Sequence, residues 1–246
     1  MNSANYEEKN GYDKKIQNDS WQGILMTQSE TQSETHPEIQ PEKKTSLREY
    51  FALSIARAKS FEFWRNMAVH FCICSVVGHW LEIPWCIFTA QLGIYDPNSL
   101  VWGDPFYPFM VYGVGAIVCA LFLTPLKDWM IERRKTITGA AFQFYITCVV
   151  VTMLMELGMG LLMNQPDASG VYPIWDNSQL PLNIMQQAWL PNDLLLGACA
   201  LLYTWIFYPM FEYIMSLPKR RTMNCVALVI VILFVFLCIA EFTEFI

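Results

Sequence analysis

Composition and hydropathy predict an all-α protein: a multi-pass transmembrane helical bundle of about five spans, preceded by an amphipathic helix at the membrane interface. Of the 246 residues, 54% are hydrophobic and only 15% are charged, whereas an ordinary soluble domain has roughly 45–50% and about 25%. The apolar residues also occur in long runs. Each run is close to the roughly 20 residues that a helix needs to cross a hydrocarbon core of about 30 Å.

The charged residues are concentrated at the N-terminal end of the chain. Nineteen of the 38 charged residues fall within the first 65 positions, and the remaining 181 residues carry only nineteen more. Residues 1–44 are rich in Glu, Gln, Asn, Ser, Thr and Lys and have almost no large apolar side chains. Such a composition cannot bury a core, so this segment is expected to be a disordered, polar cytoplasmic tail.

Residues 45–65 are predicted to form one amphipathic helix at the membrane interface. Ser46 and Glu49 have the spacing of a capping box at the start of a helix. Apolar side chains then recur every three or four residues as far as Trp64. Basic residues on the other face can meet anionic headgroups while the aromatic rings enter the acyl boundary.

Five apolar segments follow within a transmembrane domain predicted at 66–246. The spans are expected at about 67–92, 108–126, 138–163, 193–217 and 224–246, with outer loops at 93–107 and 164–192. Lys and Arg indicate the orientation, because cytoplasmic loops of membrane proteins carry an excess of both. All sixteen precede the first span or lie in the loops after the second and fourth spans. The N-terminus is therefore expected in the cytoplasm and the C-terminus outside the membrane.

Several functions are disfavoured by what the sequence lacks. The net charge of −6 offers no basic surface for nucleic acid. No phosphate-binding loop of the form GxxxxGK[ST] is present, so the chain itself is not expected to hydrolyse ATP. The eight cysteines fall in apolar segments and the motifs of zinc hydrolases are missing, so we expect neither a cofactor nor a bound metal.

The first span places a polar face deep in the bilayer. Ser75, His79 and Glu82 are separated by four and three residues, which puts them on one side of a helix. At a rise of about 1.5 Å per residue, Glu82 lies about 22 Å from the cytoplasmic boundary. An ionisable group at that depth costs about 2.5–3.5 kcal/mol on insertion scales, so it should face protein or water rather than lipid.

The third span carries a second carboxyl group, Glu156, which also falls in the outer half of the membrane. We expect Glu82 and Glu156 to line one site that opens outward, where repulsion and desolvation favour protonation of one of them. Such a pair can take up a cation or relay a proton. The alternative is that each glutamate is protonated and bonds a neighbouring helix, and His79 can likewise simply bridge helices.

The second outer loop contains the run Trp175-Asp176-Asn177-Ser178, followed by Pro181-Leu182-Asn183. Asp, Asn and Ser in such a run form turns in which side chains bond the nearby backbone, and Trp prefers the membrane interface. These properties alone favour a structural role. The four prolines and two tryptophans of this loop indicate a folded segment, which we expect to cover the outer face as a partial lid.

Four elements of the sequence resemble the type IV ABC-transporter permease family of bacterial multi-pass membrane proteins. They are Gly78-His79-Trp80-Leu81-Glu82, Gly103-Asp104-Pro105-Phe106-Tyr107-Pro108 followed by Tyr112-Gly113-Val114-Gly115, Glu156-Leu157-Gly158, and Trp175-Asp176-Asn177-Ser178 with Pro181-Leu182-Asn183. The similarity spans roughly residues 66–217, with departures such as the insertion of His79 between Gly and Trp. The resemblance implies a bacterial plasma-membrane protein. It adds functional weight to five residues: Glu82, Glu156, Trp175, Asp176 and Asn183.

These observations lead to the hypothesis of a transporter-like integral membrane subunit with an outward-facing acidic pocket in the lipid bilayer. The candidate substrate-binding residues are Glu82, Glu156, His79, Trp175, Asp176 and Asn183. A permease of this kind needs a separate ATPase subunit or another membrane subunit, and the small number of spans also favours a homo-oligomer. Two alternatives stay open. One is a membrane enzyme that acts on a lipid or lipid-linked substrate with paired glutamates as acid and base, and the other is a membrane scaffold or regulatory subunit.

Overall fold

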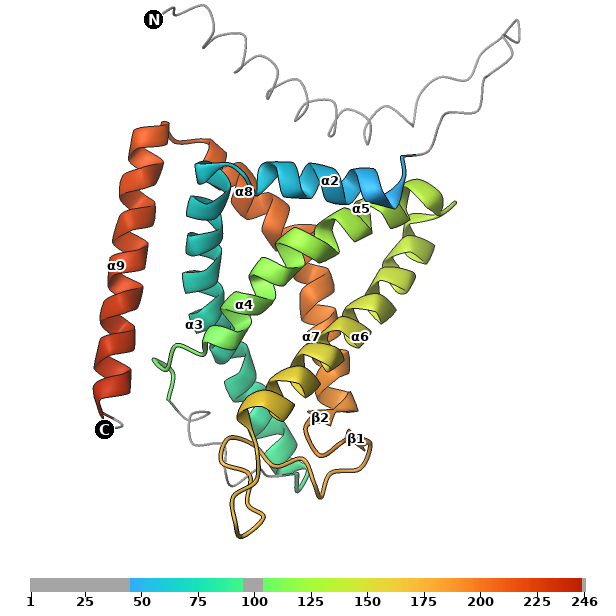
Figure 1. Cartoon of the computed structure of the whole chain (residues 1–246), viewed down its shortest axis with the longest axis vertical. Coiled ribbons are helices and arrows are strands. Elements are labelled where there is room, and N and C mark those ends of the chain that lie inside the picture. The colour runs from blue at the N-terminus through green and yellow to red at the C-terminus, as the bar shows by residue number, and fades with distance from the viewer. Residues whose placement is uncertain (1–44, 95–103, 245–246) are drawn as a thin grey trace, which may run out of the picture. The chain divides into compact units, whose positions relative to one another are not determined.

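A computed structural model of the chain describes residues 45–94 and 104–244. The predicted tail at 1–44 and the middle of the first outer loop lie outside the described residues. Within the described part, five helical segments are long and apolar enough to cross a membrane. The predicted all-α bundle of five spans is therefore confirmed (Figure 1).

The helices and strands follow one another in a simple order. The elements are α2 (Leu47–Arg57), α3 (Phe61–Gln91), α4 (Met110–Val118), the π-helical turn η2 (Cys119–Leu123), α5 (Thr124–Arg133), α6 (Ile137–Met163), β1 (Asn183–Ile184), β2 (Ala188–Trp189), α7 (Leu190–Leu202), the π-helical turn η3 (Tyr203–Phe207), α8 (Tyr208–Ser216) and α9 (Arg220–Glu244). The second span consists of α4, η2 and α5, and the fourth of α7, η3 and α8. The two strands form an antiparallel pair in the outer loop.

The region predicted as one amphipathic helix over 45–65 is divided between two helices. Its capping box is present, because the Ser46 hydroxyl accepts from the Glu49 amide and the Glu49 carboxylate accepts from the Ser46 amide at 2.7 Å. The helix α2 stops at a turn over 58–60, and α3 begins at Phe61. α2 lies across one end of the bundle and packs on α5 (Figure 1). We call this end the α2 end, and the opposite end, which carries β1 and β2, the loop end.

The spans associate as two helix pairs, α3 with α4 and α6 with α7. Small residues allow the close approach in each pair. A Cβ atom added to Gly113 of α4 would lie 2.7 Å from the backbone oxygen of Phe71 in α3. A Cβ atom added to Gly197 of α7 would lie 2.9 Å from the backbone nitrogen of Val149 in α6. The last span, α9, lies beside α3 at the edge of the bundle (Figure 1).

The two π-helical turns contact each other inside the bundle. Next to them lies a cluster of buried side chains: Cys119, Leu123, Met130, Phe144, Cys148 and Ala200. Each turn accommodates an extra residue in its helix, an irregularity that is rare and is frequent at functional sites. Sequence periodicity did not predict either turn, because one inserted residue leaves the apolar character of a span unchanged.

Glu132, near the end of α5, holds the start of α2 in place. Its carboxylate accepts a hydrogen bond from the Thr45 backbone amide at 2.9 Å and another from the Tyr50 hydroxyl at 3.3 Å. Burial of the Tyr50 hydroxyl and the nearby Glu132 charge both raise the pKa of Tyr50 above its usual value. The hydroxyl therefore keeps its proton and remains a donor at neutral pH.

We expect Glu132→Gln to speed amide hydrogen exchange across α2 by about tenfold or more, because hydrogen bonds to a charged group contribute about 1.5–3 kcal/mol each. The matched control is Glu62→Gln. Glu62 forms an exposed ion pair with Arg220 at 3.2 Å, and exposed pairs contribute little. Exchange is followed by mass spectrometry on the protein in lipid nanodiscs. Unchanged protection of α2 in the Glu132 variant contradicts this role of Glu132.

Candidate functional site

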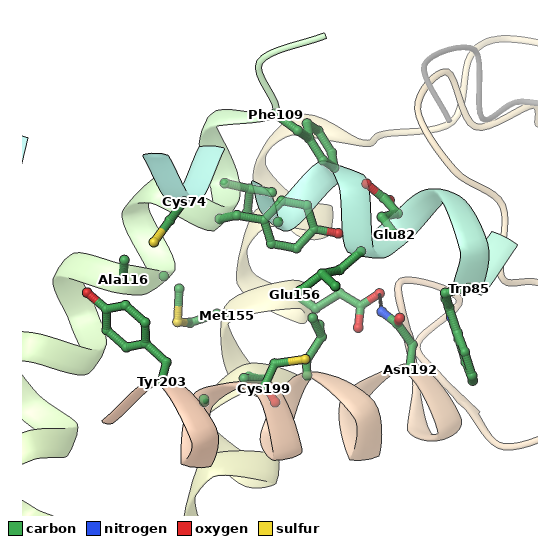
Figure 2. Close-up of a pocket in the computed structure, with 18 of the residues that line it drawn as sticks. Cys74, Glu82, Trp85, Phe109, Ala116, Met155, Glu156, Asn192, Cys199 and Tyr203 are labelled. Atoms are coloured by element: carbon green, nitrogen blue, oxygen red, sulfur yellow. Dashed lines mark hydrogen bonds between the residues drawn. The ribbon is translucent and has the colours of Figure 1, made fainter. Parts of the chain in front are cut away.

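A cavity of about 640 Å³ lies between the two helix pairs. Its walls come mainly from α3, α4, α6 and α7, from the π turns, and from the outer loop that follows α6. Most of the lining side chains are apolar or aromatic, and Figure 2 shows Glu82 on one wall with Glu156 and Asn192 on another. The volume falls in the range of about 300–1,000 Å³ that is usual for small-molecule sites.

Glu82 faces the cavity from α3 and is held by two neighbours. The Tyr112 hydroxyl of α4 hydrogen-bonds its carboxyl group, and His79 places Nδ1 3.1 Å from Glu82 Oε2. His79 is fully buried, and its Nε2 atom lies 2.7 Å from the carbonyl oxygen of Asp104. A carbonyl oxygen can only accept, so Nε2 carries a proton, and the bond from Nδ1 to Glu82 needs a second proton on one of its two partners. The His79–Glu82 pair is therefore neutral overall.

Glu156 faces the cavity from α6 and meets the start of α7. The Asn192 side-chain amide donates to Glu156 Oε1 at 3.2 Å, and the Asp193 carboxyl group is within hydrogen-bonding reach of Glu156. Asp193 is fully buried, and no donor among the described residues reaches either of its oxygens. Two carboxyl groups share a hydrogen bond only when one of them holds a proton. The Glu156–Asp193 pair therefore holds at least one proton and carries at most one negative charge.

Three tryptophans form an aromatic wall of the cavity: Trp85, Trp175 and Trp189. The rings of Trp85 and Trp189 lie with centroids 6.2 Å apart. The indole N–H of Trp175 donates to the Gln187 carbonyl at 2.8 Å, and that of Trp189 donates to the Pro181 carbonyl at 3.0 Å. The N–H groups of these two rings are used in hydrogen bonds to the loop, so the ring surface that lines the cavity is mainly carbon.

Two buried amides fasten the outer loop to the end of α6. Asn164 donates to the Trp175 carbonyl at 2.7 Å and accepts from the Ile174 backbone amide at 3.0 Å. Gln187 accepts from the Asn164 side chain at 3.1 Å and donates to the Asn164 backbone carbonyl at 3.0 Å. Both residues are buried, with exposed fractions of 0% for Asn164 and 2% for Gln187. This double contact holds Trp175 against the cavity.

Four of the six predicted site residues line the cavity: Glu82, Glu156, Trp175 and Asp176. The two glutamates therefore face the same space, although each bonds a different neighbour. His79 is not among the lining residues and positions Glu82 instead. Asn183 lies in β1, where its amide donates to the Leu180 carbonyl at 2.7 Å, so it shapes the loop rather than the cavity.

Sequence reasoning missed Asp193 and Tyr112 as parts of this site. The prediction places Asp193 at the edge of the fourth span, where a carboxylate is ordinary. The helix begins three residues earlier, at Leu190, so Asp193 lies inside the bundle next to Glu156. Pro191 was the available signal, because proline is favoured in the first turn of a helix.

The fold and the cavity define a multi-pass α-helical membrane protein with an internal acidic cavity. A family model described as "Putative ABC-transporter type IV" matches residues 69–242. The chain belongs to this family, which confirms the resemblance seen in its motifs. The match extends into all five spans and includes the outer loop. Neither a curated protein nor a solved structure matches the chain.

Proposed function

We propose that the chain is the membrane subunit of an ABC-type transporter and that the cavity between its helix pairs holds the cargo. One observation carries the proposal: a ligand-sized cavity among membrane-spanning helices is lined by two carboxyl groups, those of Glu82 and Glu156. Ionisable groups within a membrane are costly, and they commonly mark the path of a substrate or ion. Glu82, Glu156, Trp175 and Asp176 are the proposed binding residues, and His79 and Asn183 support them.

The distribution of charge supports a cavity that opens to the outside of a bacterial plasma membrane. Basic residues near the spans gather at the α2 end, in the turns before α3, between α5 and α6, and between α8 and α9. Cytoplasmic loops carry this excess, which favours a cytoplasmic N-terminus. The cavity residues Trp175 and Asp176 come from the loop at the opposite end.

A transporter of this class needs a partner, because the chain contains no phosphate-binding loop. We propose that a separate ATPase subunit docks on the turn between α5 and α6, where Arg134 and Lys135 are exposed. The membrane part is completed by a second copy of the chain or by another membrane subunit, because five spans are few for a pathway.

The test is purification in mild detergent, without crosslinker, from cells that produce the protein naturally. We expect a soluble nucleotide-binding subunit to co-purify in fixed stoichiometry and the complex to hydrolyse ATP. Lys135→Glu should lower the recovery of that subunit several-fold, because charge reversal opposes docking. Glu156→Gln should not lower it, because Glu156 lies in the cavity. A chain recovered without any ATPase subunit contradicts the proposal.

A membrane enzyme that acts on a lipid or lipid-linked substrate is the second candidate function. One observation favours it: the Glu156 and Asp193 carboxyl groups lie within hydrogen-bonding reach of each other, as a general acid next to a general base would. On this proposal, Glu156→Gln and Asp193→Asn each change the membrane lipid composition of cells while the protein remains folded. An unchanged lipid profile in both variants counts against it.

A further inference from the structure

We infer that the ligand of the cavity is a monovalent lipophilic organic cation, such as an aryl phosphonium or a bulky hydrophobic ammonium ion. The inference rests on the proposed function in one respect, namely that the cavity is a cargo site. It adds the chemical class of the cargo, which neither the fold nor the family supplies. Three features of the cavity carry it: the sign of its charge, the amount of that charge, and the carbon-rich wall around it.

The sign of the charge follows from the lining. Among the lining residues that the structure describes, Glu82, Glu156 and Asp176 are acidic and none is Lys, Arg or His. His79 lies behind Glu82 and balances it, but no basic side chain of the lining balances Glu156 or Asp176. A buried charge is stable only when it is paired, so an anionic ligand is opposed and a cationic ligand is favoured.

The amount of charge follows from the hydrogen bonds. The bond between His79 and Glu82 makes that pair neutral overall, as derived above. Asp176 accepts from the Ser178 backbone amide at 2.8 Å in a loop turn. At the level of the spanning helices, the Glu156–Asp193 pair supplies at most one negative charge, and Glu156 Oε2 is buried without a hydrogen-bond partner among the described residues. One such charge matches one positive charge on a ligand.

The wall around this charge suits a cation whose surface is carbon. The rings of Trp85, Trp175 and Trp189 line the cavity together with Phe109 and Tyr112. Aromatic faces attract a cation held within about 6 Å of the ring centre, most strongly where water is excluded. The indole N–H groups of Trp175 and Trp189 already bond the loop backbone. Few polar groups are left to solvate a small hydrated ion.

Other ligand classes fit this cavity less well. A metal ion requires several oxygen, nitrogen or sulfur ligands, and the described residues contain no group of three or more His, Cys, Asp or Glu side chains that could hold one. A lipid acyl chain fits the apolar wall but makes no use of the Glu156–Asp193 charge. A lipophilic cation uses both.

The test measures equilibrium binding of tetraphenylphosphonium to the full chain in lipid nanodiscs, with empty nanodiscs subtracted. Tetraphenylborate is the matched competitor, because it has nearly the same size and shape and the opposite charge. We expect saturable binding of tetraphenylphosphonium that tetraphenylborate does not displace. The inference is overturned if tetraphenylphosphonium shows no saturable binding or if tetraphenylborate displaces it as well as unlabelled tetraphenylphosphonium does. This part of the test uses the natural chain alone.

Variants then locate the charge. Glu156→Gln and Asp193→Asn should each weaken tetraphenylphosphonium binding by about tenfold or more, because a desolvated charge pair is lost. The control is Glu212→Gln, the same exchange in a span but outside the cavity lining, which should bind as the natural chain does. Binding is compared only among variants whose thermal unfolding temperature matches that of the natural chain. Tetraphenylphosphonium binding that is unchanged in both cavity variants overturns the inference.

The outcomes separate this inference from the proposed function. If the chain binds tetraphenylphosphonium through Glu156 but no ATPase subunit co-purifies, the ligand class stands and the proposed transporter function fails. If an active ATPase subunit co-purifies but the chain binds no tetraphenylphosphonium, the proposed transporter function stands and the ligand class fails.

Discussion

Gly197→Ala is expected to lower the free energy of unfolding by about 2 kcal/mol or more, because overpacking a tight contact typically costs about 1–3 kcal/mol. The new methyl group would lie 2.5 Å from the Val149 Cγ2 atom, 2.9 Å from its backbone nitrogen and 3.0 Å from its Cα atom. A side chain can turn away, but a backbone cannot. α6 and α7 would have to separate, and the cavity wall that carries Glu156 and Asp193 would move with them.

Gly158→Ala is the matched control for this substitution. An added Cβ atom at Gly158 meets no other atom within 4 Å, and alanine is favoured over glycine in a helix by about 1 kcal/mol. The two variants should therefore shift stability in opposite directions. Both are measured by reversible unfolding in mixed micelles, followed by tryptophan fluorescence. Equal destabilisation of both variants contradicts the assignment of Gly197 to the close contact between α6 and α7.

Asn164→Ala is expected to release the outer loop while leaving the five spans folded. The substitution removes the partners of the Trp175 carbonyl, the Ile174 amide and the Gln187 side chain together. A buried polar group left without a partner costs about 1–3 kcal/mol. Amide exchange in the loop segment 174–189 should therefore become about 100-fold faster.

Gln165→Ala is the control for the loop. Gln165 follows the end of α6 and is exposed, and among the hydrogen bonds of the described residues its side chain bonds only the Leu161 carbonyl of α6. Its replacement should leave loop exchange within about twofold of the natural chain, since exposed substitutions change stability by at most about 0.5 kcal/mol. If Asn164→Ala leaves the loop amides as protected as Gln165→Ala does, the amide pair does not hold the loop.

The spans, and the positions of the glutamates along them, could be predicted because they depend on local properties. Apolar runs of membrane length identify a span wherever they occur, and the regular rise of a helix gives the positions of Glu82 and Glu156 along their spans without any knowledge of packing. The capping box at Ser46 is equally local. These features were therefore predicted from the sequence before any contact between helices was known.

The partners of the site residues could not be predicted in the same way. The contact of Glu156 with Asp193 depends on how far α7 extends toward the loop end and on its rotation against α6. The bond from His79 to the Asp104 carbonyl depends on where the residues just before α4 lie against α3. Both are consequences of interhelical register, which apolar periodicity leaves undetermined.

The central claim is that the cavity between the two helix pairs is the ligand site and that Glu156 provides its charge. The most direct measurement is an anomalous-diffraction structure of the chain with tetraphenylarsonium, in which the arsenic atom reports the position of the cation. We predict an arsenic peak inside the cavity, among the rings of Trp85, Trp175 and Trp189 and on the side of Glu156. Arsenic found only on lipid-facing surfaces, with the cavity filled by side chains and Glu156 turned away from it, would contradict the account.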